Sequence, residues 1–587
     1  MCIRDRFFYA ALLAAAALAT AACDDDNNEG GGAVRLAKPV LSSADVSEEA
    51  FTVRWNAVDN ADSYSYAVNG GKAEKTSSTS VTVEADEGVA TYEVAVTALS
   101  ADPAKWLDSE TATIRVSLGG GQPGTDNLDD ILFENRTQIG NGDQEFEIRG
   151  DYTLPKGTYL LKGWVYICDG ATLTIEPGTV IKGDKGTKAA LIAERGGRLV
   201  AQGTAAEPIV FTSAQPAGER RPGDWGGIIL CGRARNNQTE MTIEGGPRSK
   251  HGGDDDADDS GVLSYVRCEF AGYPFQTDME INGITFGSVG SGTKLDHIQV
   301  SYSNDDSYEW FGGTANAEYL VAYHGWDDDF DTDNGFSGKV QFCLAVRNPK
   351  LADQSVSNGF ESDNCSTGAD MQPFTSCVFS NVTFVGPIGQ DPAFANTTQY
   401  IDGGALNPAN GSKLGQFQAA MQIRRNSRLS CFNSVAMGYP VGLIVENDKG
   451  SDTQAAASDG NLKIANVFFA QMTVLGSDKN KNFQDAFTDD SGEPDPSRAS
   501  FSSTYFKSIA SNRYFETIDA LMLAQPNSLA AGADYRPLAG SPLLGAASFD
   551  DAMVASGFEK VNYIGAFAEG DDWLDGWTEF DPQNKTY

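Results

Sequence analysis

Short segments in which apolar and polar residues alternate dominate the first part of the chain. Alternation with a period of two residues is the pattern of a β-strand with one buried face. Turn residues such as those in DNAD and NGG separate the segments, which are 51–58, 64–68, 80–84, 92–99 and 111–118. The pattern predicts a small antiparallel β-sandwich over residues 34–118, with Trp55 in its core.

The wording of this region, TVRWNAVDNADSYSYAVNG with TYEVAVTAL after it, resembles fibronectin type III modules. The resemblance implies a fold and says almost nothing about function, because one fold serves many functions. Residues 119–130 begin with the Gly/Pro-rich stretch GGGQPGTDN and are predicted to be a linker.

From residue 131 the sequence pattern changes to short predicted strands with glycines between them. A repeat of 22 residues also appears. Phe286, Tyr308 and Phe330 stand 22 residues apart. A repeat of this length suits one turn of a three-sided solenoid in which each turn stacks on the next. After an insertion the frame returns, so we expect one inward apolar column: Phe286, Tyr308, Phe330, Phe360, Ile423 and Val445.

The phrases WVYICDGATLTIEPGTVIKG and LIAERGGRLVAQGTAAEPIVFTS resemble right-handed parallel β-helix proteins of the pectin-lyase-like kind, in a form common among Bacteroidetes surface proteins. The closing ADYRPLAGSPLLGA and VNYIGAFAEGDDWLDGWTEF resemble the ending of the same group. The predicted fold class is therefore all-β: a right-handed parallel β-helix with a C-terminal cap over 131–587, preceded by the fibronectin-like sandwich.

Composition narrows the function classes. A net charge of −38 argues against binding to nucleic acid, because no basic stripe is available to neutralise the phosphates. Only three histidines occur, and no CxxC or HExxH, so a zinc site is not expected. Most cysteines after Cys23 lie in apolar strand patterns and are interpreted as small buried side chains; Cys365 with Cys377 is the one plausible bridge.

The N-terminus is typical of a targeting segment. Arg4 and Arg6 precede the apolar run 7–22, which is too short for a membrane span and suits a signal-peptide core. ATAAC resembles the lipobox of bacterial lipoproteins, although Thr20 stands where leucine is usual. The acidic DDDNNEGGG that follows resembles a Bacteroidetes surface-export signal, with an ordinary acidic linker as the alternative. We expect a signal peptide over 1–22, lipidation at Cys23, a linker over 23–33, and anchoring in the outer membrane at the cell surface.

The repeat also arranges carboxylates in vertical files. The residues after the column form one file, Glu309, Asp331, Glu361, Arg424 and Glu446, and those two places further form another, Phe311, Asp333, Asp363, Asn426 and Asp448. Strand alternation points both files outward. Stacked carboxylates about 4.8 Å apart repel by roughly 3 kcal/mol per pair at an effective dielectric of about 20. A bound cation, a neighbouring arginine or a shared proton must relieve this repulsion.

Two of these remedies are visible in the sequence. The oxygen ligands Asp331, Asp333, Glu361 and Asp363 suit Ca²⁺ better than a softer metal. An EF-hand is excluded, because Asn334 stands where its turn glycine belongs. A solvated acidic face with salt bridges to Arg424 and Arg425 is the alternative, and the sequence leaves both open.

The favoured function is binding of an extracellular glycan or matrix through this acidic face, because an anchor and an architecture are visible and a complete catalytic set is not. Trp310 and Trp326 would stack on sugar rings beside Arg425. A structural surface protein without a specific ligand is a further possibility.

An enzyme that acts on polysaccharide is the main alternative. A lyase would hold Ca²⁺ on the four carboxylates and use Arg424 as its base. A glycoside hydrolase would use a carboxylate pair, Asp331 with Glu361 or Asp305 with Asp328. The polygalacturonase motifs are out of pattern here (NDD, YHGWDDD and IRRN), so His324 is interpreted as a structural turn residue.

Overall fold

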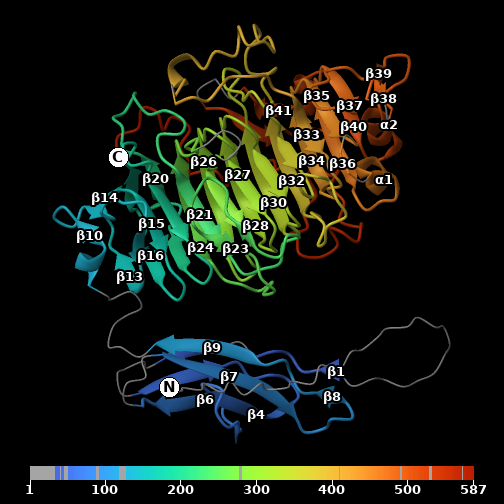
Figure 1. Ribbon diagram of the computed structural model, residues 1–587. Coiled ribbons are helices and arrows are strands. Elements are labelled where there is room, and N and C mark those ends of the chain that lie inside the picture. Colours follow the sequence, from blue (N-terminus) through green and yellow to red (C-terminus); the bar gives the residue numbers. More distant parts are fainter. Residues whose placement is uncertain are drawn as a thin grey trace, which may run out of the picture. The chain divides into compact units, whose positions relative to one another are not determined.

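The computed structural model describes residues 34–39, 41–44, 50–86, 91–117, 127–275, 280–408, 410–447, 449–450, 452–489, 492–527, 532–571 and 573–587. The chain divides into two compact units, Met1–Gln122 and Pro123–Tyr587, which are described separately (Figure 1). The predicted signal peptide, Cys23 and the acidic stretch behind it lie outside the described residues. Among the described residues, no helix is long and apolar enough to cross a membrane.

The first unit contains two antiparallel sheets that share one core. One sheet has the order β2-β3-β6 and the other β5-β4-β7-β9, while β1 pairs with β8. Trp55 packs in the shared core with its ring edge-on to Tyr64. The predicted sandwich is confirmed, and its resemblance to fibronectin type III stays a prediction. The strands are β1 (Val34–Arg35), β2 (Leu41–Ala44), β3 (Ala50–Trp55), β4 (Ala61–Val68), β5 (Glu74–Thr76), β6 (Ser80–Glu84), β7 (Thr91–Ser100), β8 (Trp106–Leu107) and β9 (Ala112–Ser117).

The second unit is a parallel β-helix, as predicted, and Figure 1 shows its strands stacked side by side. An 11-stranded sheet, here called the short-strand sheet, forms one side. Every neighbouring pair in it is parallel, and its residues alternate between the interior and the outer face. Its strands are β12 (Phe146–Ile148), β15 (Trp164–Ile167), β18 (Ala190–Ala193), β21 (Gly227–Cys231), β25 (Ile284–Gly287), β27 (Tyr308–Phe311), β29 (Phe330–Asp333), β31 (Phe360–Ser362), β33 (Ala419–Ile423), β35 (Val441–Val445) and β37 (Val474–Ser477).

The remaining sides belong to one 16-stranded sheet, here called the long-strand sheet. Its strands are β10 (Leu132–Phe133), β11 (Gln138–Ile139), β13 (Asp151–Leu154), β14 (Thr158–Leu161), β16 (Thr172–Ile175), β17 (Val180–Gly183), β19 (Arg198–Gln202), β20 (Ile209–Ser213), β24 (Gly261–Glu269), β26 (Lys294–Ser301), β28 (Ala317–Tyr323), β30 (Lys339–Val346), β32 (Val378–Val385), β34 (Ser430–Met437), β36 (Ile464–Ala470) and β40 (Arg513–Phe515). The early turns have separate strands on each side, whereas β24 pairs with both β19 and β20. From β24 onward one bent strand therefore covers two sides of each turn.

The bend in each long strand is built from a residue in the left-handed backbone region. These residues stack from turn to turn, and they are Tyr265, His297, Tyr319, Phe342, Asn381, Asn433 and Asn466. The rings of Tyr265, His297 and Tyr319 lie face to face, with centroids 4.2 and 4.5 Å apart. Further along, Asn466 Nδ2 donates to Asn433 Oδ1 over 2.7 Å.

The C-terminal segment, residues 541–587, runs back along these bends and does more than cap one end. Trp577 lies edge-on to the Tyr265 and His297 rings. Asn381 Nδ2 donates to the Tyr563 carbonyl, and Lys182, on an early turn, donates to the carbonyl of Tyr587. The segment thus ties late turns to early ones.

The last turn is covered by a helix. In α2 (Phe501–Ser508) the Phe506 ring stacks on Phe469 at 4.4 Å, and Ser502 Oγ accepts from the Val445 backbone N–H. The other small elements are η1 (Leu128–Asp130), η2 (Gly404–Leu406), η3 (Ile518–Leu521), α1 (Thr453–Ser458), β22 (Met241–Thr242), β23 (Lys250–His251), β38 (Phe487–Thr488), β39 (Pro494–Asp495), β41 (Leu523–Gln525) and β42 (Asp534–Pro537).

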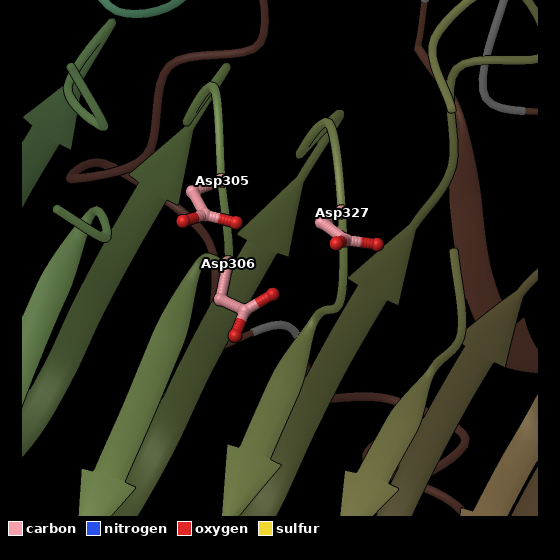
Figure 2. A group of neighbouring side chains, drawn as sticks. All are labelled: Asp305, Asp306 and Asp327. Carbon is pink, nitrogen blue, oxygen red and sulfur yellow. The ribbon is translucent and has the colours of Figure 1, made fainter. Parts of the chain in front are cut away.

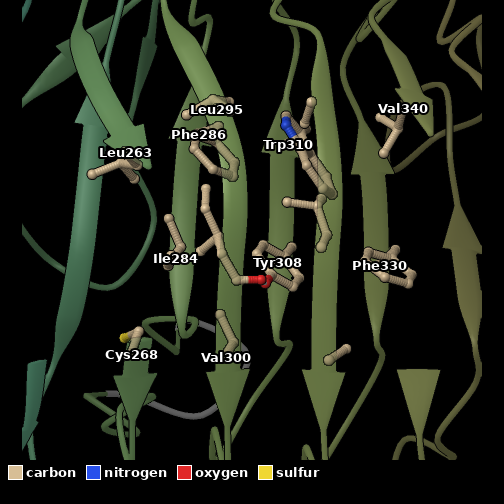
Figure 3. Packing of buried hydrophobic residues seen from close by; sticks show 14 of the residues in the cluster. Leu263, Cys268, Ile284, Phe286, Leu295, Val300, Tyr308, Trp310, Phe330 and Val340 are labelled. Carbon is tan, nitrogen blue, oxygen red and sulfur yellow. The ribbon is translucent and has the colours of Figure 1, made fainter. Parts of the chain in front are cut away.

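The predicted inward column is correct in the middle and wrong at both ends. Tyr308, Phe330 and Phe360 lie opposite one another on β27, β29 and β31. Ile284 pairs with Tyr308, and Phe286 pairs with Trp310 (Figure 3). At the other end Met421 and Leu443 continue the column, two residues before the predicted Ile423 and Val445. The turns differ in length, so a uniform repeat of 22 residues cannot hold the register throughout.

The cysteines in the described residues are buried and free, as expected for small core side chains. The Cys365–Cys377 bridge is therefore a wrong prediction. Cys377 lies in the interior of the β-helix, where burial raises the pKa of its thiol to about 12.

Candidate functional site

The predicted carboxylate file lies on the outer face of the short-strand sheet. Glu309, Asp331 and Glu361 are direct neighbours on β27, β29 and β31. Each follows an inward aromatic residue of the core, so the strand alternation that buries the ring places the acid on the opposite face. The sequence pattern is sufficient to predict these three positions.

The turns that enter β27 and β29 bring more carboxylates to the same place. Figure 2 shows Asp305 and Asp306 before β27 and Asp327 before β29. One carboxylate oxygen from each of these three lies within 4.8 Å of the others, and the same is true of Asp306, Glu309 and Asp331. We call these five residues, Asp305, Asp306, Glu309, Asp327 and Asp331, the acidic cluster.

The ionised forms of the carboxylates in the acidic cluster are disfavoured by burial and by mutual repulsion. Burial, and then the charge of neighbouring carboxylates, raises the pKa of Asp305, Asp306 and Asp331 well above the usual range. The same causes raise the pKa of Glu309. Among the described residues, no basic side chain forms an ion pair with any of the five. Protons or bound cations must therefore compensate the charge.

On the next turn of the β-helix, arginines compensate the charge of the outer-face carboxylates. Arg424 Nε donates to Asp363 Oδ1 over 2.9 Å, and its guanidinium also binds Glu361. Arg425 Nη1 donates to Asp363 Oδ2 over 2.5 Å. Burial alone lowers the pKa of Arg424, but the charges of Glu361 and Asp363 outweigh it and hold that pKa well above its usual value. A base needs a depressed pKa, so these surroundings argue against the predicted role of Arg424 as a base, which stays a prediction.

The register explains this pairing. Ser362 pairs with Ile423, so Arg424 comes next to Asp363, whereas Gln422 continues the file of Glu361. The prediction that Arg424 continues the Glu361 file, and that Asn426 continues the Asp363 file, is therefore wrong by two residues. Asp448 itself lies outside the described residues.

The predicted metal ligands do not form one group. Among the described residues, only Asp331 of the four belongs to a set of convergent carboxylates. Glu361 and Asp363 are bound by arginines, and Asp333 Oδ1 accepts from the Asn334 backbone N–H over 2.5 Å. Burial, and then the charge of Asp363, raises the pKa of Asp333 to about 8. The candidate metal position is therefore not at Glu361 and Asp363 but around Asp331, one turn of the β-helix closer to the N-terminus.

Neither predicted sugar-stacking tryptophan lies on the outer face. Trp310 is 1% exposed and stacks on Phe286 and Phe336 inside the β-helix. Trp326 is 0% exposed, and its Nε1 donates to Asp353 Oδ2 over 3.1 Å. Both predicted positions are therefore wrong. Trp310 lies two residues after the inward Tyr308 and, by strand alternation, points inward with it.

His324 is a structural residue, as the sequence suggested. It is buried in the turn before β29, where its Nδ1 lies 3.0 Å from the Tyr302 hydroxyl. Burial lowers the pKa of His324 to about 3, so the ring is neutral at physiological pH.

Inserted segments lie against the acidic cluster. Ser355 Oγ donates to Asp327 Oδ2 over 2.6 Å from the 346–357 insertion. Asn304, next to Asp305, donates to Ser412 Oγ over 2.7 Å in the segment before β33. On another side the Asn282 amide contacts the Glu309 carboxylate. Loops on a rigid scaffold thus surround the cluster, which is where binding residues commonly lie.

Sequence reasoning undervalued Asp306 and Asp327. The signal that identifies them is the repeat itself, because Asp305 and Asp306 stand 22 residues before Asp327 and Asp328. Acidic pairs at the same position of two stacked turns must lie side by side. The short spacing from Asp306 to Glu309 then brings the strand residue into the same group.

A family model described as "Pectate-lyase like beta helix domain" matches residues 146–500, more than half of the 587-residue chain. The chain belongs to this family. In this pectate-lyase-like chain the acidic cluster and the arginine-bound carboxylates all lie within the matched region. The C-terminal segment over 541–587 lies beyond it.

No curated protein matches this pectate-lyase-like chain. Among solved structures, the Family 28 exopolygalacturonase of Yersinia enterocolitica matches with 11% identity and a TM-score of 0.19. The match covers 76% of this chain and 97% of that chain. An identity and a TM-score this low give no argument about activity.

Proposed function

We propose that this chain acts on carbohydrate by binding an acidic polysaccharide through a divalent cation held at the acidic cluster. The observation that carries the proposal is the contrast between two neighbouring turns. Glu361 and Asp363 have arginine partners, whereas Asp306, Glu309 and Asp331 converge without one. A cation supplies the charge that the protein provides elsewhere with arginine.

The residues present fit Ca²⁺. Its ligands in proteins are oxygens, often carboxylates, in flexible geometry. Asp306, Glu309 and Asp331 offer three such oxygens, and Asp331 Oδ1 is buried with no hydrogen-bond partner among the described residues. When bound, the cation would supply positive charge that attracts the carboxylate of an acidic sugar. These carboxylates would hold the cation: Glu309 on β27, Asp331 on β29 and Asp306 in the turn before β27.

A glycoside hydrolase is the second candidate, and one observation favours it. Asp305, Asp306 and Asp327 converge within 4.8 Å, and burial raises the pKa of each. Such a group can hold one carboxyl protonated as a general acid while its neighbour stays ionised. The lyase version with Arg424 as base has no comparable support.

The proposed place of action is the cell surface, with Cys23 as the lipid-anchored residue in the outer membrane. Only the sequence supports this part of the proposal. The favoured role remains attachment to an extracellular polysaccharide or matrix, and catalysis is the alternative.

Binding of polygalacturonate to the full chain tests the proposal. We expect binding in Ca²⁺ that is lost in a chelator and in Glu309→Gln/Asp331→Asn. Asp254→Asn is the matched control, because it removes an exposed carboxylate from a different acidic run and should bind normally. Binding that is indifferent to the chelator and to the double variant would refute the proposal.

The same samples separate binding from catalysis. New reducing ends without unsaturated sugars would indicate a hydrolase, and loss of these products in Asp306→Asn would assign it to the cluster. Binding without either product would leave adhesion as the function.

A further inference from the structure

A groove lies on the outer face of the long-strand sheet, whereas the acidic cluster lies on the short-strand sheet. The groove has a volume of about 590 Å³, which is within the range of sites that hold small ligands. Its floor is the start of three neighbouring strands, β26, β28 and β30, and its wall is residues 557–559 of the C-terminal segment. We call it the C-terminal groove.

Hydrogen bonds fix the wall of the C-terminal groove to its floor. Gln341 Nε2 donates to the Glu559 carbonyl over 2.8 Å, and the Glu559 backbone N–H donates to Gln341 Oε1 over 2.8 Å. Lys339 Nζ donates to the Ser556 carbonyl over 2.6 Å. The groove is therefore formed before a ligand arrives, so binding does not have to order the wall.

One polar side chain of the floor has no partner. Asp296, Glu318 and Gln341 lie side by side at outward positions of the three strands. Asp296 accepts from Ser264 Oγ over 2.7 Å and pairs with Lys294 over 2.9 Å, and Gln341 is bound to the wall. Glu318, between them, is exposed and forms no hydrogen bond or ion pair among the described residues. Its carboxylate is thus an acceptor that is open to a ligand.

The charges around the C-terminal groove disfavour a charged ligand of either sign. Lys294 and Lys339 line it together with Asp296, Glu318 and Glu559. An anionic ligand would meet the carboxylates, and a cationic ligand would meet the ammonium groups. A sugar hydroxyl both donates and accepts, so it can donate to Glu318 and accept from Lys294, whose ammonium has three protons.

Phe558 adds an apolar surface to the wall. Its ring is half-buried and lines the groove, with Lys339 Nζ 5.5 Å from the ring centroid. The C–H face of a sugar ring is apolar, and packing it on an aromatic ring removes both surfaces from water. Neighbouring strands lie about 4.8 Å apart, so a sugar chain that runs across β26, β28 and β30 meets new side chains at each turn.

We infer that the C-terminal groove binds a neutral oligosaccharide, with Glu318 and Lys294 as its hydrogen-bonding residues and Phe558 as its stacking residue. The ligand proposed for the acidic cluster is an acidic polysaccharide held through a cation. The groove gives the chain a second carbohydrate site with a different specificity, and binding there requires no cation.

Calorimetric titration of the full chain in chelator tests the inference, because a chelator removes any cation from the acidic cluster. The probes are cellohexaose, xylohexaose and mannohexaose, with hexagalacturonate as the charged counterpart. The variants are Glu318→Ala, which removes a carboxylate without a partner, and Phe558→Leu, which removes the ring and keeps an apolar side chain. Asp254→Ala and Phe580→Leu are the matched controls, because they change an exposed carboxylate and an exposed ring outside the groove. Thermal unfolding checks that each variant folds.

We expect at least one neutral hexasaccharide to bind the wild type and both controls equally. Glu318→Ala should weaken this binding about tenfold, because a hydrogen bond to a charged group is lost, and Phe558→Leu should weaken it about fivefold. Three results would each overturn the inference: no neutral hexasaccharide binds, either groove variant binds like the wild type, or hexagalacturonate binds as tightly as the neutral sugars. Because these titrations contain no free Ca²⁺, they leave the proposed function to its own test.

Discussion

Arg424 lies beside Asp363 on the neighbouring turn, and its Nε donates to Asp363 Oδ1 over 2.9 Å. The same guanidinium binds Glu361. This contact divides the outer-face carboxylates of the short-strand sheet into two sets. Those on β31 and just after it are neutralised by arginine, and those around β27 and β29 are not. This division is the reason why we propose a cation at the acidic cluster.

Removal of Arg424 should destabilise the protein strongly. Arg424→Met leaves Glu361 without its partner and Asp363 with Arg425 alone. Because both carboxylates are largely buried, the loss costs about 3 kcal/mol of unfolding free energy. Chemical denaturation measures the loss. Lys156→Met is the control, because its pair with Glu207 is exposed, and it should change the unfolding free energy by at most about 1 kcal/mol. Equal losses in the two variants would contradict the account.

Stability should depend on pH in a direction set by the raised carboxyl pKa values. Burial is the main cause that raises the pKa of Asp306 and Asp331, and it raises that of Asp333 to about 8. Between about pH 4, where free carboxyls ionise, and pH 8, the folded state holds protons that the unfolded chain releases. Without cations the unfolding free energy therefore falls as pH rises through this window.

Ca²⁺ should reverse much of that trend, because it replaces the protons. Thermal unfolding midpoints at several pH values, in Ca²⁺ and in chelator, measure the difference. We expect the two curves to meet near pH 4 and to separate steadily toward pH 8. Parallel curves across the whole range would show that the cation and these carboxyls are not linked.

The sequence predicts the fold well because the alternation of apolar and polar residues is local. It also predicts the file Glu309, Asp331 and Glu361, since these acids follow rings that must be buried. It fails where an insertion resets the register. The segment between β31 and β33 is long, and only backbone pairing shows that Met421 follows Phe360 in the column. Because the register differs by two residues from the predicted one, Arg424 lies beside Asp363 and does not continue the file of Glu361.

The C-terminal segment should contribute to the stability of the whole β-helix. Trp577 is almost fully buried against the stacked rings of Tyr265 and His297. Trp577→Ala should lower the unfolding free energy by about 3 kcal/mol through lost burial and a new cavity. Leu538→Ala, at an exposed position, should have little effect. A Trp577→Ala protein as stable as wild type would show that the segment is not anchored there.

The predicted lipid anchor has a direct test of its own. Cells that express the chain should incorporate a labelled fatty acid into it, and Cys23→Ala should abolish the label and release the protein from the membrane fraction. A label that persists in Cys23→Ala, or a wild-type protein that is never labelled, would refute the anchor. The carbohydrate proposal would be unaffected.

Anomalous X-ray scattering from crystals grown with Ca²⁺ tests the central claim most directly, because it locates the ion itself. We predict an anomalous peak bounded by Asp306, Glu309 and Asp331, and no such peak beside Glu361 and Asp363, where arginines already provide the charge. Crystals with full Ca²⁺ exposure and no peak at the acidic cluster would contradict the account.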